Sequence, residues 1–277
     1  MPTPPRPLLV LHTNGAFRER VRRVGPRGFQ CIFLTGWDGL RQAVVDSPPA
    51  AIVIVDPYLD SRAADPQLSP ELRALLWEFP SATVLAALEI RPGRSRDLRT
   101  LGEWGVTDVI SLVEDDTHEA IYRRLRAVEG RSLQTLLERM LPPLLSGRTR
   151  MLMMTAAEVV SAGGKARELA RRLHLSERTV LRWAERGGLP PPRRLLAWMR
   201  ILLAASLLDD PGRSVLSVAH ACGYASDSSL RRAMQDFLDT GPSALRREGA
   251  FTSASHAFLQ ELSQTRAQAR DRHSLRF

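Results

Sequence analysis

Residues 215–239, VLSVAHACGYASDSSLRRAMQDFLD, carry two apolar stripes separated by a glycine. The first stripe has the spacing of one helix face and consists of Val215, Val218, Ala219 and Cys222. Gly223 ends this helix, and the polar stretch after it supplies a start for another. Two short helices joined by a tight turn that contains glycine are typical of a helix-turn-helix unit.

The second helix of this unit separates apolar from polar side chains. Its apolar face repeats at helical spacing and consists of Leu230, Ala233, Met234, Phe237 and Leu238. The opposite face shows Ser228, Ser229, Arg231, Arg232 and Gln235. Arginine can bind a guanine edge through two hydrogen bonds, and serine and glutamine reach bases or phosphates. This face is therefore expected to contact duplex DNA.

A second unit of the same kind precedes it at residues 165–188, KARELARRLHLSERTVLRWAERGG. The expected packing faces consist of Leu169, Ala170 and Leu173 in the first helix and Val180, Trp183 and Ala184 in the second. Ser176 is the predicted N-cap of the second helix. Arg178, Arg182 and Arg186 recur every four residues, which predicts a basic stripe on the outer face of that helix.

The two units are joined by RRLLAWMRILLAASLL, residues 193–208, which has a helical pattern and ends at the turn sequence DDPG. At about 1.5 Å per residue, this connector spans roughly 24 Å. Successive major grooves on one side of B-DNA recur about every 34 Å. With the width of the two units added, one monomer is expected to reach two adjacent major grooves of double-stranded DNA.

These segments together resemble the DNA-binding domain of AraC/XylS-type bacterial transcription regulators, from a helix around residues 150–160 to Arg247. The most specific part is the second unit, whose spacing follows the family signature at Val218, Ala219, Gly223, Tyr224, Leu230, Met234, Pro242 and Arg246. The sequence departs from the family at Leu230 and Met234, where aromatic residues are usual, and at Asp239, where a glycine is common. In the first unit, Ala184 replaces a larger apolar residue.

The resemblance implies which residues face the DNA bases. In the first unit they are Arg178, Leu181 and Arg182, with Thr179 nearby and Arg186 extending the stripe. In the second unit they are Asp227, Ser228, Ser229 and Arg232, with Arg231 beside them. Leu181 is suited to a thymine methyl group. Asp227 either accepts a hydrogen bond from cytosine or caps its helix, and we favour the cap.

The first half of the chain alternates short apolar runs with helical patterns. Strands are expected at residues 8–11, 31–34, 51–55, 83–88 and 109–113, and helices at 17–24, 40–45, 71–79, 98–104 and 119–128. Ser69 before Pro70 predicts one helix start, and Asp116 with Glu119 predicts another. Short, continuously apolar strands that alternate with helices predict a flavodoxin-like α/β domain, with a five-stranded, doubly wound parallel sheet.

Charge divides the chain in the same place as the secondary structure. Of the formal net charge of +9, residues 1–130 contribute −1 and residues 131–277 contribute +10. A basic half suggests an anionic partner, which agrees with DNA. We therefore expect a receiver-like domain at 1–130, a linker helix at 131–147, an all-α DNA-binding domain with two helix-turn-helix units at 148–250, and a tail at 251–277.

The run AIVIVDP at residues 51–57 resembles the end of the third strand in response-regulator receiver domains, where an aspartate accepts a phosphoryl group. That chemistry needs Mg²⁺ held by further carboxylates and a cation beside the acceptor. Here His12, Thr13 and Asn14 stand where the acidic pair would be, and the only lysine of the chain is Lys165. We interpret Asp56 as structural and the domain as a pseudo-receiver used for dimerisation or sensing.

Two alternatives stay open at this point. One is a response regulator that accepts phosphate at Asp56, and the other is an enzyme that uses the crevice of the α/β domain. Ligands of such sheets bind at the carboxyl ends of the strands, a place lined here by His12, Asn14, Asp56, Tyr58 and Glu89.

The remaining chemistry in the sequence is weak. Six histidines and two cysteines show no metal-ligand spacing, and no phosphate-binding glycine loop occurs. We expect no cofactor, no metal and no catalytic residues. No run is apolar enough for a signal peptide or a membrane span, so we expect a cytoplasmic protein without a membrane partner. A homodimer through the N-terminal domain or the linker helix, and a contact with RNA polymerase, complete the expected partners.

Overall fold

The computed structural model describes residues 5–61, 66–91, 93–128, 131–142 and 145–274. The chain forms two compact units. The α/β unit runs to Arg131 and includes Asp210–Gly212, and the helical unit consists of Ser132–Asp209 and the chain from Arg213 onward. Each unit has its own hydrophobic core and is described by itself.

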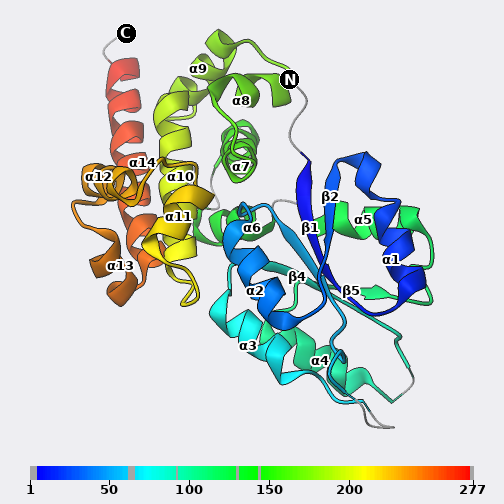
Figure 1. Cartoon of the computed structure of the whole chain (residues 1–277). Coiled ribbons are helices and arrows are strands. Elements are labelled where there is room, and N and C mark those ends of the chain that lie inside the picture. Colours follow the sequence, from blue (N-terminus) through cyan, green and yellow to red (C-terminus); the bar gives the residue numbers. More distant parts are fainter. Residues whose placement is uncertain (1–4, 62–65, 92, 129–130, 143–144, 275–277) are drawn as a thin grey trace. The chain divides into compact units, whose positions relative to one another are not determined.

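The α/β unit is built on one five-stranded parallel sheet (Figure 1). Its strands are β1 (Arg6–Leu11), β2 (Phe29–Phe33), β3 (Ile52–Val55), β4 (Thr83–Leu88) and β5 (Asp108–Ser111). Their order across the sheet is β2-β1-β3-β4-β5. This is the flavodoxin-like, doubly wound order, so the predicted fold class of the first half is confirmed.

Five helices cover the two faces of this sheet: α1 (Gly15–Arg22), α2 (Trp37–Asp46), α3 (Pro70–Glu78), α4 (Ser95–Trp104) and α5 (His118–Val128). The helices α1 and α5 lie on one face, and α2, α3 and α4 lie on the other (Figure 1). Alternate residues of β1 enter the two cores, Leu8 on the first side and Leu9 on the second. The strands are apolar on both faces because both faces are covered.

The sequence predicted the N-caps of two helices in this unit, Ser69 and Asp116. Ser69 caps α3 as predicted, because its hydroxyl accepts a hydrogen bond from the Glu71 amide at 3.3 Å. The predicted cap at Asp116 is wrong. The α5 helix begins at His118, so the residue before it is Thr117, and Thr117 caps it by accepting from the Ala120 amide at 3.2 Å. Threonine and aspartate both favour this position, so neighbouring candidates cannot be separated by residue type alone.

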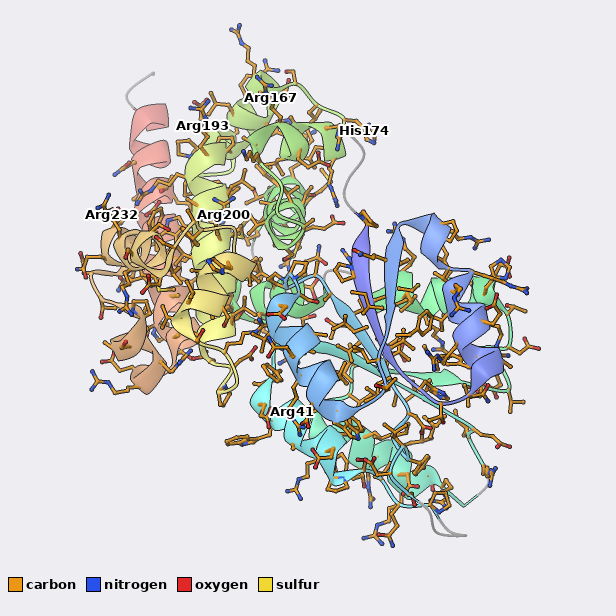
Figure 2. The ribbon with its side chains drawn as sticks, in the orientation of Figure 1. Arg41, Arg167, His174, Arg193, Arg200 and Arg232 are labelled. Carbon is orange, nitrogen blue, oxygen red and sulfur yellow. The ribbon has the colours of Figure 1, made fainter. Side chains whose placement is uncertain are left out.

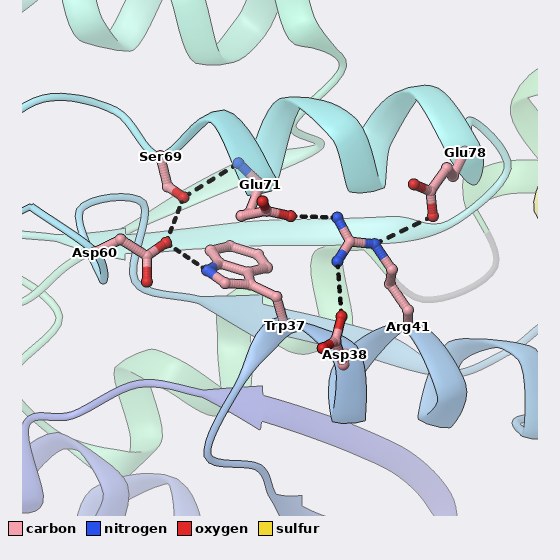
Figure 3. A network of polar contacts seen from close by, with 7 residues as sticks. All are labelled: Trp37, Asp38, Arg41, Asp60, Ser69, Glu71 and Glu78. Carbon is pink, nitrogen blue, oxygen red and sulfur yellow. Dashed lines mark hydrogen bonds and ion pairs between the residues drawn. The ribbon is translucent and has the colours of Figure 1, made fainter.

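A polar network joins α2 to α3 (Figure 3). The Arg41 guanidinium donates to Glu71 at 2.5 Å and to Glu78 at 3.2 Å. On the same helix pair, Asp60 accepts from the Trp37 indole at 2.6 Å and from the Ser69 hydroxyl at 2.8 Å. The network holds the two helices together at their solvent edge, above the apolar contacts that cover the sheet.

The helical unit contains no strand among the residues that the structure describes. Its helices are α6 (Arg131–Met140), α7 (Gly147–Ser161), α8 (Ala166–Arg172), α9 (Glu177–Arg186), α10 (Pro192–Leu208), α11 (Val215–Ala221), α12 (Asp227–Leu238), α13 (Pro242–Glu248) and α14 (Ala250–Ser274). The α10 helix forms the centre of one core, with most of its side chains buried, among them Leu195, Trp198 and Leu202. The prediction that the second half is all-α is confirmed.

The segments before and after the paired units also belong to this core. Leu133 and Leu137 of α6 are buried against the helical unit, so the apolar stripe of the expected linker helix is already packed. The sequence left the state of the tail open between a terminal helix and a frayed end. In the structure it forms the helix α14, with Ala254, Phe258 and Leu262 buried.

Candidate nucleic-acid interface

The first paired unit consists of α8 and α9. Leu169 and Ala170 of α8 face Val180 and Ala184 of α9, and all four side chains are buried. The turn between the helices passes through His174, whose φ of 53° lies in the left-handed region. Ser176 caps α9 by accepting from the Thr179 amide at 3.1 Å, as predicted.

The outer face of α9 is basic and exposed. Arg178, Arg182 and Arg186 follow one another along it, and Leu181 beside them is 38% exposed. Thr179 takes a different position. Its side chain is half-buried, and its hydroxyl lies 2.9 Å from the Ser176 hydroxyl, so it supports the start of the helix.

The second paired unit consists of α11 and α12, with Gly223 in the turn. The φ of Gly223 is +76°, and the Tyr224 amide donates to the Ala219 carbonyl at 2.9 Å, which closes the turn behind α11. A residue with a Cβ would be strained at this φ, which gives a physical reason for glycine here. Leu230 and Met234 of α12 are fully buried on the inner face of the unit.

The start of α12 differs from the expectation for Asp227. The N-cap is Ser226, not Asp227, and it forms a capping box with Ser229. The Ser226 hydroxyl accepts from the Ser229 amide at 3.2 Å, and the Ser229 hydroxyl accepts from the Ser226 amide at 3.1 Å. Asp227 lies one residue inside the helix and forms an ion pair with Arg231 at 3.4 Å. Of the predicted base-facing residues, Ser229 is thus held by the cap, while Ser228 and Arg232 are exposed.

Further basic residues surround these faces and were not singled out from the sequence (Figure 2). Arg167 at the start of α8 has a 95% exposed side chain, and His174 is exposed in the turn. On α10, Arg193 is exposed and Arg200 is half-buried. Their spacing of seven residues, two helical turns, puts both on one side of an otherwise apolar helix. That spacing was visible in the sequence and predicts a polar stripe along the connector.

Residues 169–248 match the family model of a helix-turn-helix domain. This part of the chain is an AraC-type helix-turn-helix domain. The match spans α9, α10, α11 and α12 and ends at the last residue of α13. A chain with this domain is a DNA-binding transcription regulator.

A similar solved structure is full-length FixJ from B. japonicum, with 15% sequence identity and a TM-score of 0.32 over 84% of this chain and 97% of that one. No curated protein matches the chain significantly.

Outside the AraC-type domain, the carboxyl edge of the sheet carries the other predicted site. His12 follows β1 and is only 4% exposed. One of its ring nitrogens, Nε2, lies 3.2 Å from the Ala87 carbonyl, and the other, Nδ1, accepts from the Asn14 amide at 3.0 Å. Burial lowers the pKa of His12 below its ordinary value, and the nearby Asp56 carboxylate only partly opposes this. Both ring nitrogens are therefore engaged in the way a neutral imidazole requires.

The remaining residues of this edge are held by local partners. Asn14 caps α1 by accepting from the Phe17 amide, and Asp56 accepts from the Tyr58 amide at 2.9 Å. The Tyr58 hydroxyl donates to Asp97 at 2.7 Å, and burial together with this carboxylate raises the pKa of Tyr58 to about 12.

The predicted edge residues do not form one cluster. Glu89 pairs with Arg91, while Tyr58 turns to the start of α4. Among the described residues, no three histidines, cysteines or carboxylates lie close enough to hold a metal ion. Within the same residues, no helix is long and apolar enough to cross a membrane.

Proposed function

We propose that this regulator binds one side of duplex DNA with α9 and α12 in two successive major grooves. The observation that carries the proposal is the pair of exposed polar faces, each on the second helix of its unit and both joined to the single helix α10. With its 17 residues, α10 has a length of about 26 Å at 1.5 Å per residue. That length, with the units at either end, suits the groove repeat of about 34 Å.

Exposure on the outer faces of α9 and α12 is the support for the contacts that we propose. We assign base contacts to Arg178, Leu181 and Arg182 in the first groove and to Ser228 and Arg232 in the second. Arg186 and Arg231 lie further along the same faces and are assigned to phosphates. Thr179 and Ser229 act through the helix starts that they support, because their hydroxyl groups already have partners.

Selection of binding sites from random duplex DNA with the full chain tests this proposal. The expected result is a site with two separate sequence elements whose centres lie about one helical turn, roughly 10 base pairs, apart. Footprinting on the recovered site should then protect one side of the duplex. A single uninterrupted element, or no enriched sequence at all, would contradict the proposal.

For the α/β unit we infer a role that does not use phosphorylation. The support is His12, which lies buried beside Asp56 with both ring nitrogens engaged, and the absence of any lysine from residues 1–130. Among the residues that the structure describes, no group of three histidines, cysteines or carboxylates could hold the metal ion that such chemistry needs.

Intact-mass measurement after incubation with a small phosphodonor and Mg²⁺ is the test of that inference. We expect no phosphoryl adduct on the full chain. An adduct that forms on the natural protein and is lost in Asp56→Ala would overturn it.

The α/β unit is also the proposed dimerisation surface, with contacts to RNA polymerase or a sensed ligand as further roles. The apolar stripe of α6 is packed inside its own unit, which leaves the linker helix little apolar surface for a partner. Sedimentation equilibrium of the full chain tests the dimer. A monomer at every concentration, with and without DNA, would rule it out.

A further inference from the structure

The C-terminal helix α14 begins where the connecting helix α10 ends. The Asp209 carboxylate, at the C-terminus of α10, accepts from the Ala250 amide at 2.8 Å and from the Phe251 amide at 2.9 Å. These are amide groups of the first turn of α14, which have no partner inside their own helix. One side chain therefore fixes the end of α10 to the start of α14.

From this point α14 runs antiparallel to α10 and lies beside it (Figure 1). The Phe258 ring is fully buried and lies 5.4 Å from the Trp198 ring of α10. The other neighbour of Trp198 is Phe237 of the recognition helix α12, at 4.8 Å in an edge-on arrangement. The aromatic cluster Trp198, Phe237 and Phe258 thus joins α14, α10 and the C-terminal end of α12.

The middle of α14 reaches the start of α10 and the turn that follows α9. Glu261 receives two hydrogen bonds from the Arg194 guanidinium, at 2.6 and 2.5 Å, near the N-terminus of α10. Five residues further on, Arg266 packs against Gly188, which follows directly after α9 and its C-cap. A Cβ added at Gly188 would lie 2.6 Å from the Cγ of Arg266 and 3.2 Å from its Cα.

We propose that α14 is a brace that fixes the distance and rotation between the two recognition helices, and so restricts binding to sites with one spacing between their two elements. The inference rests on the proposed two-groove function. Without α14, α9 is joined to α10 by residues 187–191, α12 is joined to α10 through α11, and each of the two helices packs on α10. With α14, one helix packs against α12 and also against Gly188, the residue after the C-cap of α9. Glu261 and Phe258 are positioning residues in this arrangement.

The rigidity of such a brace can be measured by changing the spacing between the two sequence elements of the DNA site. Adding one base pair between two elements moves the second by about 3.4 Å along the duplex and by about a tenth of a turn around it. A rigid protein loses contacts at one element when this happens, whereas a protein whose units can shift keeps more of them. The quantity to measure is the spacing penalty, defined as the affinity for the selected site divided by the affinity for the same site lengthened by one base pair.

The test compares full-length variants on both sites. In Glu261→Gln and in Arg194→Glu, we expect the spacing penalty to fall at least about threefold, in line with an ion pair of moderate strength. The double variant Arg194→Glu with Glu261→Arg restores the pair in reverse and should restore the penalty. Phe258→Leu should act in the same direction as the single charge variants.

A matched control removes an ion pair that does not involve α14. Glu158 of α7 pairs with Arg172 of α8 at 2.6 Å, between the first paired unit and the helix before it. Glu158→Gln should leave the spacing penalty unchanged, even where it lowers the affinity for both sites. Circular dichroism confirms that each variant is folded.

Two outcomes overturn the brace. One is an unchanged spacing penalty in the folded Glu261→Gln and Phe258→Leu proteins, and the other is a double variant that fails to restore the penalty. Failure of the proposed function looks different, because the selected site then has a single element and no spacing to vary.

Discussion

Most charged side chains on the outer faces of α9 and α12 are arginines, and these arginines differ in their local partners. Arg182 and Arg232 are exposed on the outer faces of α9 and α12. Arg231 instead pairs with Asp227, one turn away on the same helix. A guanidinium that is already paired at the surface must break this weak contact to bind DNA, whereas an unpaired, exposed one only loses water. Arg182 and Arg232 are therefore the best candidates for base readout.

Arg182→Ala and Arg232→Ala should each weaken binding to the selected site by about 1–3 kcal/mol, with a smaller loss on random DNA. The reason is that a base contact is lost only where the matching base is present. Fluorescence anisotropy with both duplexes measures the two losses. The control is Arg99→Ala, which removes an arginine that is also exposed, from α4 of the α/β unit. Equal losses on specific and random DNA would contradict base readout.

His12 is a buried, packed residue at the carboxyl edge of the sheet, where a receiver domain would have an acidic side chain. Its ring lies 4.7 Å from the Phe17 ring, and its Nε2 atom contacts the Ala87 carbonyl near the end of β4. Because burial lowers the pKa of His12, the unfolded chain takes up a proton at a higher pH than the folded chain does. The contribution of His12 to stability is thus complete above the unfolded pKa, near 6.5, and is lost as the pH falls toward the folded value.

His12→Gln should make the stability of the α/β unit less dependent on pH below about 6.5, by up to about 1.4 kcal/mol per pH unit, the slope for one proton. Hydrogen exchange followed by mass spectrometry on peptides from β1 and β3 gives the stability at each pH. The natural protein and the variant are compared at the same pH, so other titrating groups cancel. A parallel pH dependence in the two proteins would show that His12 is not the titrating group.

At the scale of elements, the end of α12 has an aspartate where the AraC/XylS-type pattern commonly has a glycine. Asp239 has a φ of 53°, in the left-handed region, and its amide closes the helix by donating to the Gln235 carbonyl at 3.0 Å. Glycine adopts this conformation without steric cost, which explains why it is common at the position. An aspartate there also puts a negative charge at the negative end of the helix dipole.

Asp239→Gly should therefore stabilise the helical unit by about 1 kcal/mol. Asp239→Asn removes the charge and keeps a side chain, so it should give a smaller gain of a few tenths of a kcal/mol. Hydrogen exchange of peptides from α12 and α13 measures both. A less stable Asp239→Gly protein would mean that the Asp239 side chain stabilises the helical unit by more than the left-handed backbone conformation costs.

At the scale of the whole molecule, the two units have separate hydrophobic cores, and the two halves of the chain differ in net charge. Two apolar clusters flank the sheet of the α/β unit, and one large cluster surrounds α10 in the helical unit. The acidic residues of the first half balance its arginines, while the second half carries the excess of +10. DNA is therefore expected to stabilise one unit and not the other, since a ligand stabilises the structure that binds it.

Calorimetry of the full chain should show two unfolding transitions, and the selected duplex should raise the midpoint of only one of them by several degrees. Hydrogen exchange at intermediate temperature assigns that transition to the helical unit. A scrambled duplex of equal length is the control and should give a smaller shift. A single transition, or an equal shift of both, would show that the two units unfold together.

Much of this architecture could be predicted from local sequence patterns. The alternation of short apolar runs with helical periods predicted all five strands, because a strand covered on both faces must be apolar along its length. Glycine and serine marked the turns of the paired units, since the left-handed turn at Gly223 and the capped start at Ser176 each need a particular residue type. The basic outer stripe of α9 followed from spacing alone.

Other features depended on three-dimensional packing. The choice between Asp227 and Ser226 as the cap of α12, and between Asp116 and Thr117 for α5, depends on where the first turn closes, and neighbouring cap residues have similar propensities. The packing of α14 against α10 could not be predicted from local sequence either. Its polar composition with a few spaced apolar residues suits either a frayed end or a docked helix.

The sequence by itself determined the two-part plan of this protein, the order of its helices and strands, and which half is basic, because these depend on residue type and period within short windows. Only the tertiary structure decided that His12 is buried beside Asp56 and that α14 lies along α10 from Asp209 to Gly188. Those contacts join residues far apart in the chain, and their energy depends on the shape of both partners.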